Sequence, residues 1–129
     1  MGRTRQQVGI AAALAVIAVE AWGSLKETDM VVEYIRYEVP PDKHDEFVAG
    51  YKSAGRDLEA SSHCLKYEIA EGVEEPNNFV VRIEWDSLEG HEKGFRSSPQ
   101  MAPFFQKVKP FYAMIKEMKH YSVKGTGKK

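Results

Sequence analysis

A tryptophan and a histidine, Trp85 and His91, are the side chains in this sequence best suited to chemistry on an organic substrate. A neutral imidazole, whose ordinary pKa is about 6.5, can act as a general base at neutral pH. An indole ring offers a flat apolar wall and one N–H donor, which needs an acceptor when the ring is buried. The predicted roles are therefore a general base for His91 and a pocket wall for Trp85.

Further aromatic side chains could enclose the ring of a bound molecule and exclude water from it. The candidate substrate-binding residues are Tyr67, Phe95, Phe104, Phe105 and Tyr112. A structural interpretation stays open beside the catalytic one, with Trp85 as an ordinary core residue and His91 as a surface or internally satisfied histidine. The remaining histidines, His44, His63 and His120, are assigned no chemistry.

The composition is that of an ordinary globular chain with balanced charge. Of 129 residues, 43% are hydrophobic and 29% are charged, and 18 basic residues nearly balance 19 acidic ones. Without a basic excess, the chain is not expected to bind the phosphate backbone of a nucleic acid. The single cysteine, Cys64, excludes an internal disulfide, and no zinc-type ligand cluster is expected.

Hydrophobic periodicity predicts a regular alternation of strands and helices. The predicted strands are 30–39, 64–71, 79–85 and 118–123, and the predicted long helices are 43–61 and 100–116. A short helix that begins at Asp86 or Ser87 should carry His91 over the end of the sheet where Trp85 lies. This order is the split β-α-β arrangement (βαββαβ), an α+β fold of the ferredoxin-like type with both helices on one face of an antiparallel sheet.

Strand parity divides this sheet into two faces of different composition. The face expected to meet the helices has Leu65, Tyr67, Ile69, Phe79, Val81, Ile83 and Trp85. The opposite face has Arg36, Glu38, Lys66, Glu68, Arg82 and Glu84, mixed with Val32, Tyr34 and Val80. Such a face could be solvated, but its valines and its tyrosine favour a second sheet packed against it. A homodimer through this face is therefore expected.

Residues 1–29 precede the predicted domain of residues 30–123 and are expected to be dispensable for its fold. Arg3 and Arg5 come before an uncharged, alanine-rich run of 12 residues, Val8 to Val19, which has the layout of a secretory signal. This run is too short to cross a bilayer core of about 30 Å, so membrane association is not expected.

Three interpretations of the extension remain open: translation that begins at Met30 or a short N-terminal helix, a signal ending near residue 23, and a true membrane anchor. The expected location is therefore the cytoplasm, or outside it if residues 1–23 are a signal peptide. Residues 124–129, which include Lys124, Lys128 and Lys129, are expected to form a disordered basic tail.

The segment Ile83–His91, IEWDSLEGH, continued by Phe95–Pro99, FRSSP, resembles the signature of antibiotic biosynthesis monooxygenase domains. In that family a strand ends in tryptophan, a short acidic helix carries a histidine, and a Ser-Pro break precedes an aromatic helix. The resemblance extends over about residues 30–123. It implies two ferredoxin-like subunits whose sheets form a shared dimeric α+β barrel, with a pocket in each subunit between the sheet and the helices.

Characterised members of this family include monooxygenases that oxidise phenolic or quinol-like aromatics with O2 and without metal or flavin. The resemblance implies a cofactor-independent monooxygenase for a small aromatic substrate, in which His91 forms the substrate anion and Trp85 helps to hold the ring. The alternative is a non-enzymatic ligand-binding or dimerisation domain on the same fold.

Two positions differ from known members. The quinone-forming members have an asparagine where this chain has Val81. Haem-degrading relatives have their iron-binding histidine where this chain has Phe95, so haem degradation is not expected.

Overall fold

The predicted strands form one antiparallel sheet in a computed structural model that describes residues 29–129. Its strands are β1 (Val31–Glu38), β2 (Cys64–Glu71), β3 (Asn78–Trp85) and β4 (Ile115–Ser122). They lie in the order β2-β3-β1-β4, and each neighbouring pair is antiparallel. The order confirms the predicted ferredoxin-like arrangement, in which each long helix connects two strands that are not neighbours. Almost all of the predicted N-terminal extension lies outside the described residues.

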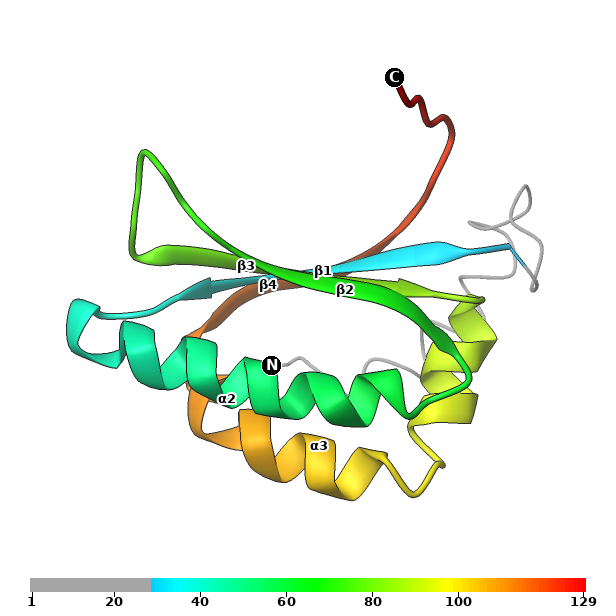
Figure 1. The fold of residues 1–129 in the computed structure, drawn as a ribbon, viewed down its shortest axis with the longest axis horizontal. Helices are drawn as coiled ribbons and strands as arrows, with labels where there is room; N and C mark the ends of the chain where they lie inside the picture. Colours follow the sequence, from blue (N-terminus) through cyan, green and yellow to red (C-terminus); the bar gives the residue numbers. More distant parts are fainter. Residues whose placement is uncertain (1–28) are drawn as a thin grey trace.

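Two helices cover one face of this sheet, as Figure 1 shows. Helix α2 (His44–Glu59) follows a single 3₁₀ turn, η1 (Pro41–Lys43), and α3 (Met101–Val108) lies beside it. The buried residues of α2 recur at spacings of three and four, as expected for one helical face: Phe47, Tyr51, Ala54, Gly55 and Leu58. The hairpin connection between β2 and β3 and the C-terminal segment project on the other side of the sheet (Figure 1).

An aromatic core fills the space between α2 and the sheet. Phe47 is fully buried and contacts the rings of Tyr37, Phe79 and Phe111 at centroid distances of 4.8, 5.0 and 5.2 Å. The hydroxyls of Tyr37 and Tyr51 hydrogen-bond to each other, so that neither is left unpaired in this core. Much of the high aromatic content therefore serves packing, around the opposite end of β3 from Trp85.

The predicted helix-facing side of β2 is wrong at Leu65, which is 55% exposed. The register between β2 and β3 shifts between Cys64, which pairs with Trp85, and Lys66, which pairs with Glu84. This bulge places one extra residue on β2, so that Cys64 faces the core in place of Leu65. Simple alternation cannot anticipate such an inserted residue.

The predicted helix over 100–116 is too long. Helix α3 ends at Val108, a 3₁₀ segment, η3 (Lys109–Met114), follows, and Ile115 already belongs to β4. Pro110 explains the early end, because proline lacks the N–H that an α-helix would pair with the carbonyl four residues earlier. The last strand accordingly begins three residues before the predicted Met118.

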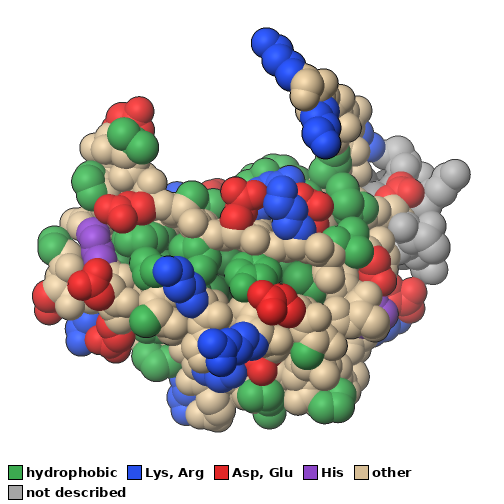
Figure 2. Space-filling view, in the orientation of Figure 1, with side chains coloured by type: hydrophobic (Ala, Val, Ile, Leu, Met, Phe, Trp, Pro, Cys, Tyr) green, Lys and Arg blue, Asp and Glu red, His purple; other side chains and the backbone are tan. Residues whose placement is uncertain are grey.

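Acidic and basic side chains are intermixed on the side of the molecule seen in Figure 2. No helix within residues 29–129 is both long and apolar enough to cross a bilayer. Residues 124–129 are exposed and follow β4 without regular structure, and their disorder stays a prediction.

Candidate active site

Four side chains from four separate elements converge at the end of β3. Glu33 comes from β1, Trp85 from β3, His91 from the helical segment after β3, and His120 from β4. Glu33 pairs with His120 in the register of β1 and β4, so that both side chains lie on the helix-facing side of the sheet. These four residues are called the buried cluster below.

A carboxylate is the centre of the buried cluster. Glu33 is 3% exposed, although it lies in a strand between Val31 and Ile35, which are both core residues. The indole Nε1–H of Trp85 donates to Glu33 Oε1 at 3.1 Å, and Nε2 of His91 lies 3.5 Å from the same oxygen. Burying a carboxylate is costly unless such donors surround it, and these two groups supply the compensation.

The His91 side chain makes contacts through its ring face and through both ring nitrogens. Its ring stacks on Trp85 with 4.3 Å between centroids and 12° between planes, and the residue is 6% exposed. Its Nδ1 shares a hydrogen bond of 2.7 Å with Nε2 of His120. Both ring nitrogens of His91 are therefore engaged, one by a carboxylate and one by a second histidine.

Both histidines are neutral at physiological pH. Burial lowers the pKa of His91 to about 3, and the nearby positive charge of Arg96 acts in the same direction. Burial also lowers the pKa of His120 to about 4, although the charge of Glu33 opposes this shift. A neutral imidazole has one donor and one acceptor nitrogen, so the hydrogen bond between the rings can form without a second proton.

A wide helical turn presents His91 to the cluster. The segment η2 (Gly90–Phe95) is a π-helix, a geometry often found at functional sites. Ser87 Oγ accepts the backbone N–H of Gly90 at 2.8 Å, so of the two predicted capping residues it is Ser87 that holds the start of this turn. The predicted short helix is confirmed, and it carries His91 to Trp85 as expected.

A third histidine, His63, lies against η2. His63 Nδ1 lies 2.9 Å from a carboxylate oxygen of Asp86, at the end of β3. A Cβ atom at Gly94 would lie only 2.4 Å from Nε2 of His63, so glycine permits this close approach of η2. His63 therefore has a positioning contact with the segment that carries His91.

Two predicted substrate-binding residues extend the buried cluster. The ring of Phe95 lies 5.1 Å from Trp85, and the ring of Phe104 lies 5.3 Å from Phe95. Phe95 is 2% exposed, whereas Phe104 is half-buried on α3. The structure thus brings Trp85, His91, Phe95 and Phe104 into one contiguous group.

The other three predicted substrate-binding residues lie apart from this group. The hydroxyl of Tyr67 donates to Glu59 at 2.8 Å, and its ring lies against Gly55 of α2. Phe105 and Tyr112 contact each other, with 37% and 48% of their areas exposed. Among residues 29–129, no hydrogen bond or ring contact joins these three to the buried cluster.

Sequence reasoning missed Glu33 and set His120 aside. The signal for Glu33 was available, because it is a charged residue at an inward position of an otherwise apolar strand face. His120 becomes adjacent to His91 only through the register of β4 on β1, which the sequence alone does not specify.

The cluster also resembles a metal-binding donor set. Ligand atoms of Glu33, His91 and His120 all lie within 4.8 Å of one another. Two imidazoles and a carboxylate suit divalent transition metals. The prediction that no metal is bound rested on the cysteine count, which could not reveal this group.

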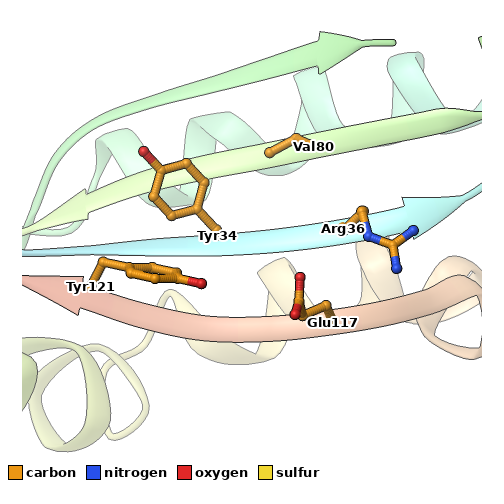
Figure 3. Close-up of a pocket in the computed structure, with 5 residues that line it drawn as sticks. All are labelled: Tyr34, Arg36, Val80, Glu117 and Tyr121. Atoms are coloured by element: carbon orange, nitrogen blue, oxygen red, sulfur yellow. The ribbon is translucent and has the colours of Figure 1, made fainter. Parts of the chain in front are cut away.

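A hollow of about 290 Å³ lies on the opposite face of the sheet. It is lined by Tyr34, Arg36, Val80, Glu117 and Tyr121, and Figure 3 shows these side chains on β1, β3 and β4 with the helices behind the sheet. Tyr34 and Tyr121 meet edge to face with 5.3 Å between centroids. This hollow belongs to the face predicted for dimerisation, not to the buried cluster.

The strand order β2-β3-β1-β4, with both long helices on one face of the sheet, defines an α+β domain of the ferredoxin-like class. The sequence profile of the antibiotic biosynthesis monooxygenase family matches residues 30–107, which is more than half of the chain. The chain belongs to this family.

Several individual proteins are similar to this chain. The uncharacterised protein YczJ of Bacillus subtilis is 22% identical over 92 residues, which are 71% of this chain and 97% of YczJ. A structure from Chloroflexus aurantiacus, assigned to the antibiotic biosynthesis monooxygenases, is 23% identical with a TM-score of 0.62 and covers 77% of this chain and 98% of its own. SnoaB of Streptomyces nogalater, a cofactor-independent oxygenase, is 14% identical with a TM-score of 0.61 and covers 76% and 96%. At these identities the solved structures establish the fold alone.

The two positions that differ from known family members are both occupied by buried apolar side chains. Val81 is fully buried in the core, and Phe95 packs against Trp85. The group that accepts the indole N–H of Trp85 in this chain is the carboxylate of Glu33, from the neighbouring strand β1. The site therefore has a different polar arrangement from the one that the family resemblance implied.

Proposed function

We propose that this protein is a cofactor-independent monooxygenase that oxidises a small phenol-like or quinol-like aromatic with O2. The observation that carries the proposal is the neutral histidine pair of the buried cluster, held against Trp85 and the carboxylate of Glu33. Family membership and the similarity to SnoaB, a cofactor-independent oxygenase, support the same reaction class.

The chemistry needs a base and an apolar site. A neutral imidazole removes the hydroxyl proton of the substrate, and the resulting anion transfers an electron to O2 far more readily than the neutral phenol does. A phenol and O2 yield a quinone and water, so the substrate supplies all the electrons and no external reductant is consumed. Phe95 and Phe104 continue the apolar ring cluster beside Trp85, and the half-buried Phe104 is its most exposed ring.

Oxygen uptake by the purified protein tests this function. With a panel of dihydroquinones and phenols in an oxygen-electrode cell, uptake is expected to exceed the enzyme-free autoxidation rate. His91→Ala is expected to lower the rate by about 10²–10⁴-fold, because the histidine pair is broken. His44→Ala is the matched control, since His44 bonds the carbonyl of Val39 and lies outside the buried cluster. Full activity in His91→Ala, or uptake no faster than autoxidation, would refute the proposal.

The second candidate function is a non-enzymatic ligand-binding or dimerisation domain. The observation that favours it is the hollow between Tyr34 and Tyr121, on a sheet face that no described helix covers. Arg82 on this face bonds Glu84 at 2.5 Å and the hydroxyl of Tyr34 at 3.2 Å. Internally paired charges around exposed aromatic rings suit a surface that a second subunit covers. Ligand binding without oxygen uptake would favour this function over the first.

A homodimer through this face is expected in either case. The proposed interface contains Arg36, Lys66, Glu68, Arg82 and Glu84, together with Tyr34. Tyr34→Glu is expected to raise the dimer dissociation constant by about 10²-fold, or about 2.7 kcal/mol, because a charge would be buried between two sheets. Phe105→Glu is the matched control, since it changes an equally exposed aromatic residue on α3. Light scattering that gives the 14.6 kDa monomer mass for the unmodified chain at micromolar concentration would contradict the dimer.

A further inference from the structure

The hydrogen bond between His91 and His120 has two possible directions. In one, Nε2–H of His120 donates to Nδ1 of His91; in the other, Nδ1–H of His91 donates to Nε2 of His120. The two arrangements differ in which nitrogen of each neutral ring carries the proton. They therefore also differ in whether Nδ1 of His120, the nitrogen outside this hydrogen bond, carries a proton or a free lone pair.

Glu33 selects the first direction. Its Oε1 accepts the indole N–H of Trp85 and lies 3.5 Å from Nε2 of His91. A carboxylate next to a neutral imidazole favours the tautomer that points an N–H at it, because the other tautomer would oppose a lone pair to a negative charge. Nε2 of His91 then carries the proton, Nδ1 accepts, and His120 must donate from Nε2. The remaining nitrogen, Nδ1 of His120, is left with its lone pair.

The two histidines also differ in burial and in how many of their ring nitrogens are engaged. His91 is 6% exposed, stacked on Trp85, and engaged at both nitrogens. His120 is less buried, on the edge strand β4, and among residues 29–129 its Nδ1 has no hydrogen-bond partner. A substrate hydroxyl can form a hydrogen bond with a free lone pair, whereas His91 has none to offer.

We propose that His120, rather than His91, accepts the proton of the substrate, and that Glu33 and His91 are positioning residues that keep the lone pair on His120 Nδ1. This inference rests on the proposed monooxygenase function and assigns the base within it. The chain Glu33–His91–His120 works by the logic of a carboxylate that orients a catalytic imidazole, with one more imidazole between them. The proton accepted at His120 Nδ1 passes to the reduced oxygen as water forms, which returns the ring to its neutral state.

The tautomers can be read without any substrate. Long-range ¹H–¹⁵N spectra of the ¹⁵N-histidine-labelled chain at pH 7 are expected to show both His91 and His120 as neutral Nε2–H tautomers, assigned with His91→Gln and His120→Gln. In Glu33→Gln the negative charge is removed, and the Nδ1–H forms of both rings are expected to become populated. An Nδ1–H tautomer for His120 in the unmodified chain would overturn the proposal. So would a stoichiometric divalent metal in the purified protein, since it would occupy the same nitrogens.

Activity then separates the base from the residues that orient it. His120→Ala is expected to lose about 10²–10⁴-fold in oxygen uptake and to recover part of it with added imidazole, because a base at the less buried position can be replaced from solution. Glu33→Gln is expected to lose about 10²-fold or more with KM nearly unchanged, as befits a wrong tautomer rather than a lost contact with substrate. Imidazole should not restore Glu33→Gln. Full activity in His120→Ala would overturn the assignment of the base.

Different results would refute the proposed function and the assignment of His120 as the base. Expected tautomers without oxygen uptake by the unmodified chain would refute the proposed function, and the assignment of a base with it. Oxygen uptake that survives in His120→Ala but is lost in His91→Ala would leave the function standing and return the base to His91.

Discussion

Trp85→Ala is expected to lower the free energy of unfolding by about 3–5 kcal/mol, the range for removal of a large buried aromatic side chain. Trp85 is 1% exposed and packs against both His91 and Phe95, so that the truncation opens a cavity between β3 and η2. The substitution also deprives the buried carboxylate of Glu33 of its indole donor. Urea denaturation followed by far-UV circular dichroism measures the change.

Two control variants separate the loss of the indole N–H from the loss of buried apolar area. Trp85→Phe keeps most of the apolar area but loses the N–H, and it is expected to fold, to cost about 1–3 kcal/mol and to weaken substrate binding. Tyr112→Ala removes a ring that is 48% exposed and is expected to cost much less than Trp85→Ala. A Trp85→Ala chain as stable as Tyr112→Ala would show that the cluster does not support the fold.

Acid is expected to destabilise the protein between about pH 6.5 and pH 4 through the two histidines of the buried cluster. The folded pKa is lowered to about 3 for His91 and to about 4 for His120, whereas an unfolded histidine has a pKa of about 6.5. Below pH 6.5 the unfolded chain binds protons that the folded chain does not, so stability rises with pH in this window. The contribution of the two neutral histidines to the free energy of unfolding is fully present above about pH 6.5. It is lost as the pH falls toward their folded-state pKa values. Each histidine contributes a slope of up to about 1.4 kcal/mol per pH unit.

Other charges near the cluster set the size of this slope. Arg96 opposes protonation of both histidines, and Glu33 favours protonation of His120. Free energies of unfolding measured from pH 4 to pH 8 should therefore fall less steeply in His91→Gln and His120→Gln than in the unmodified chain, since glutamine does not titrate. Parallel curves for all three proteins would mean that both histidines are exposed to protons in the folded state.

Local patterns predict the parts of this fold that depend on short-range physics. Alternation identifies β3 as a strand with Phe79, Val81, Ile83 and Trp85 on the core face, and all four are buried. The pattern fails where one residue changes the geometry, at the bulge near Leu65 and at Pro110. The proline was visible in the sequence, whereas the bulge was not, because it depends on which residue of β3 each residue of β2 pairs with.

The residues of the proposed site also fall into those that local sequence brings together and those that strand pairing brings together. Trp85, His91 and Phe95 lie within one stretch of eleven residues, so a strand followed by a short helix brings them together by local geometry, and the sequence by itself determined this half of the cluster. Glu33 and His120 are separated from them by about fifty and thirty residues, and they meet only because β1 lies between β3 and β4 in a particular register. A shift of one residue in either pairing would turn Glu33 or His120 to the other face of the sheet. The tertiary structure alone therefore decided which carboxylate lies beside His91 and which histidine shares a hydrogen bond with it, since both depend on long-range strand pairing.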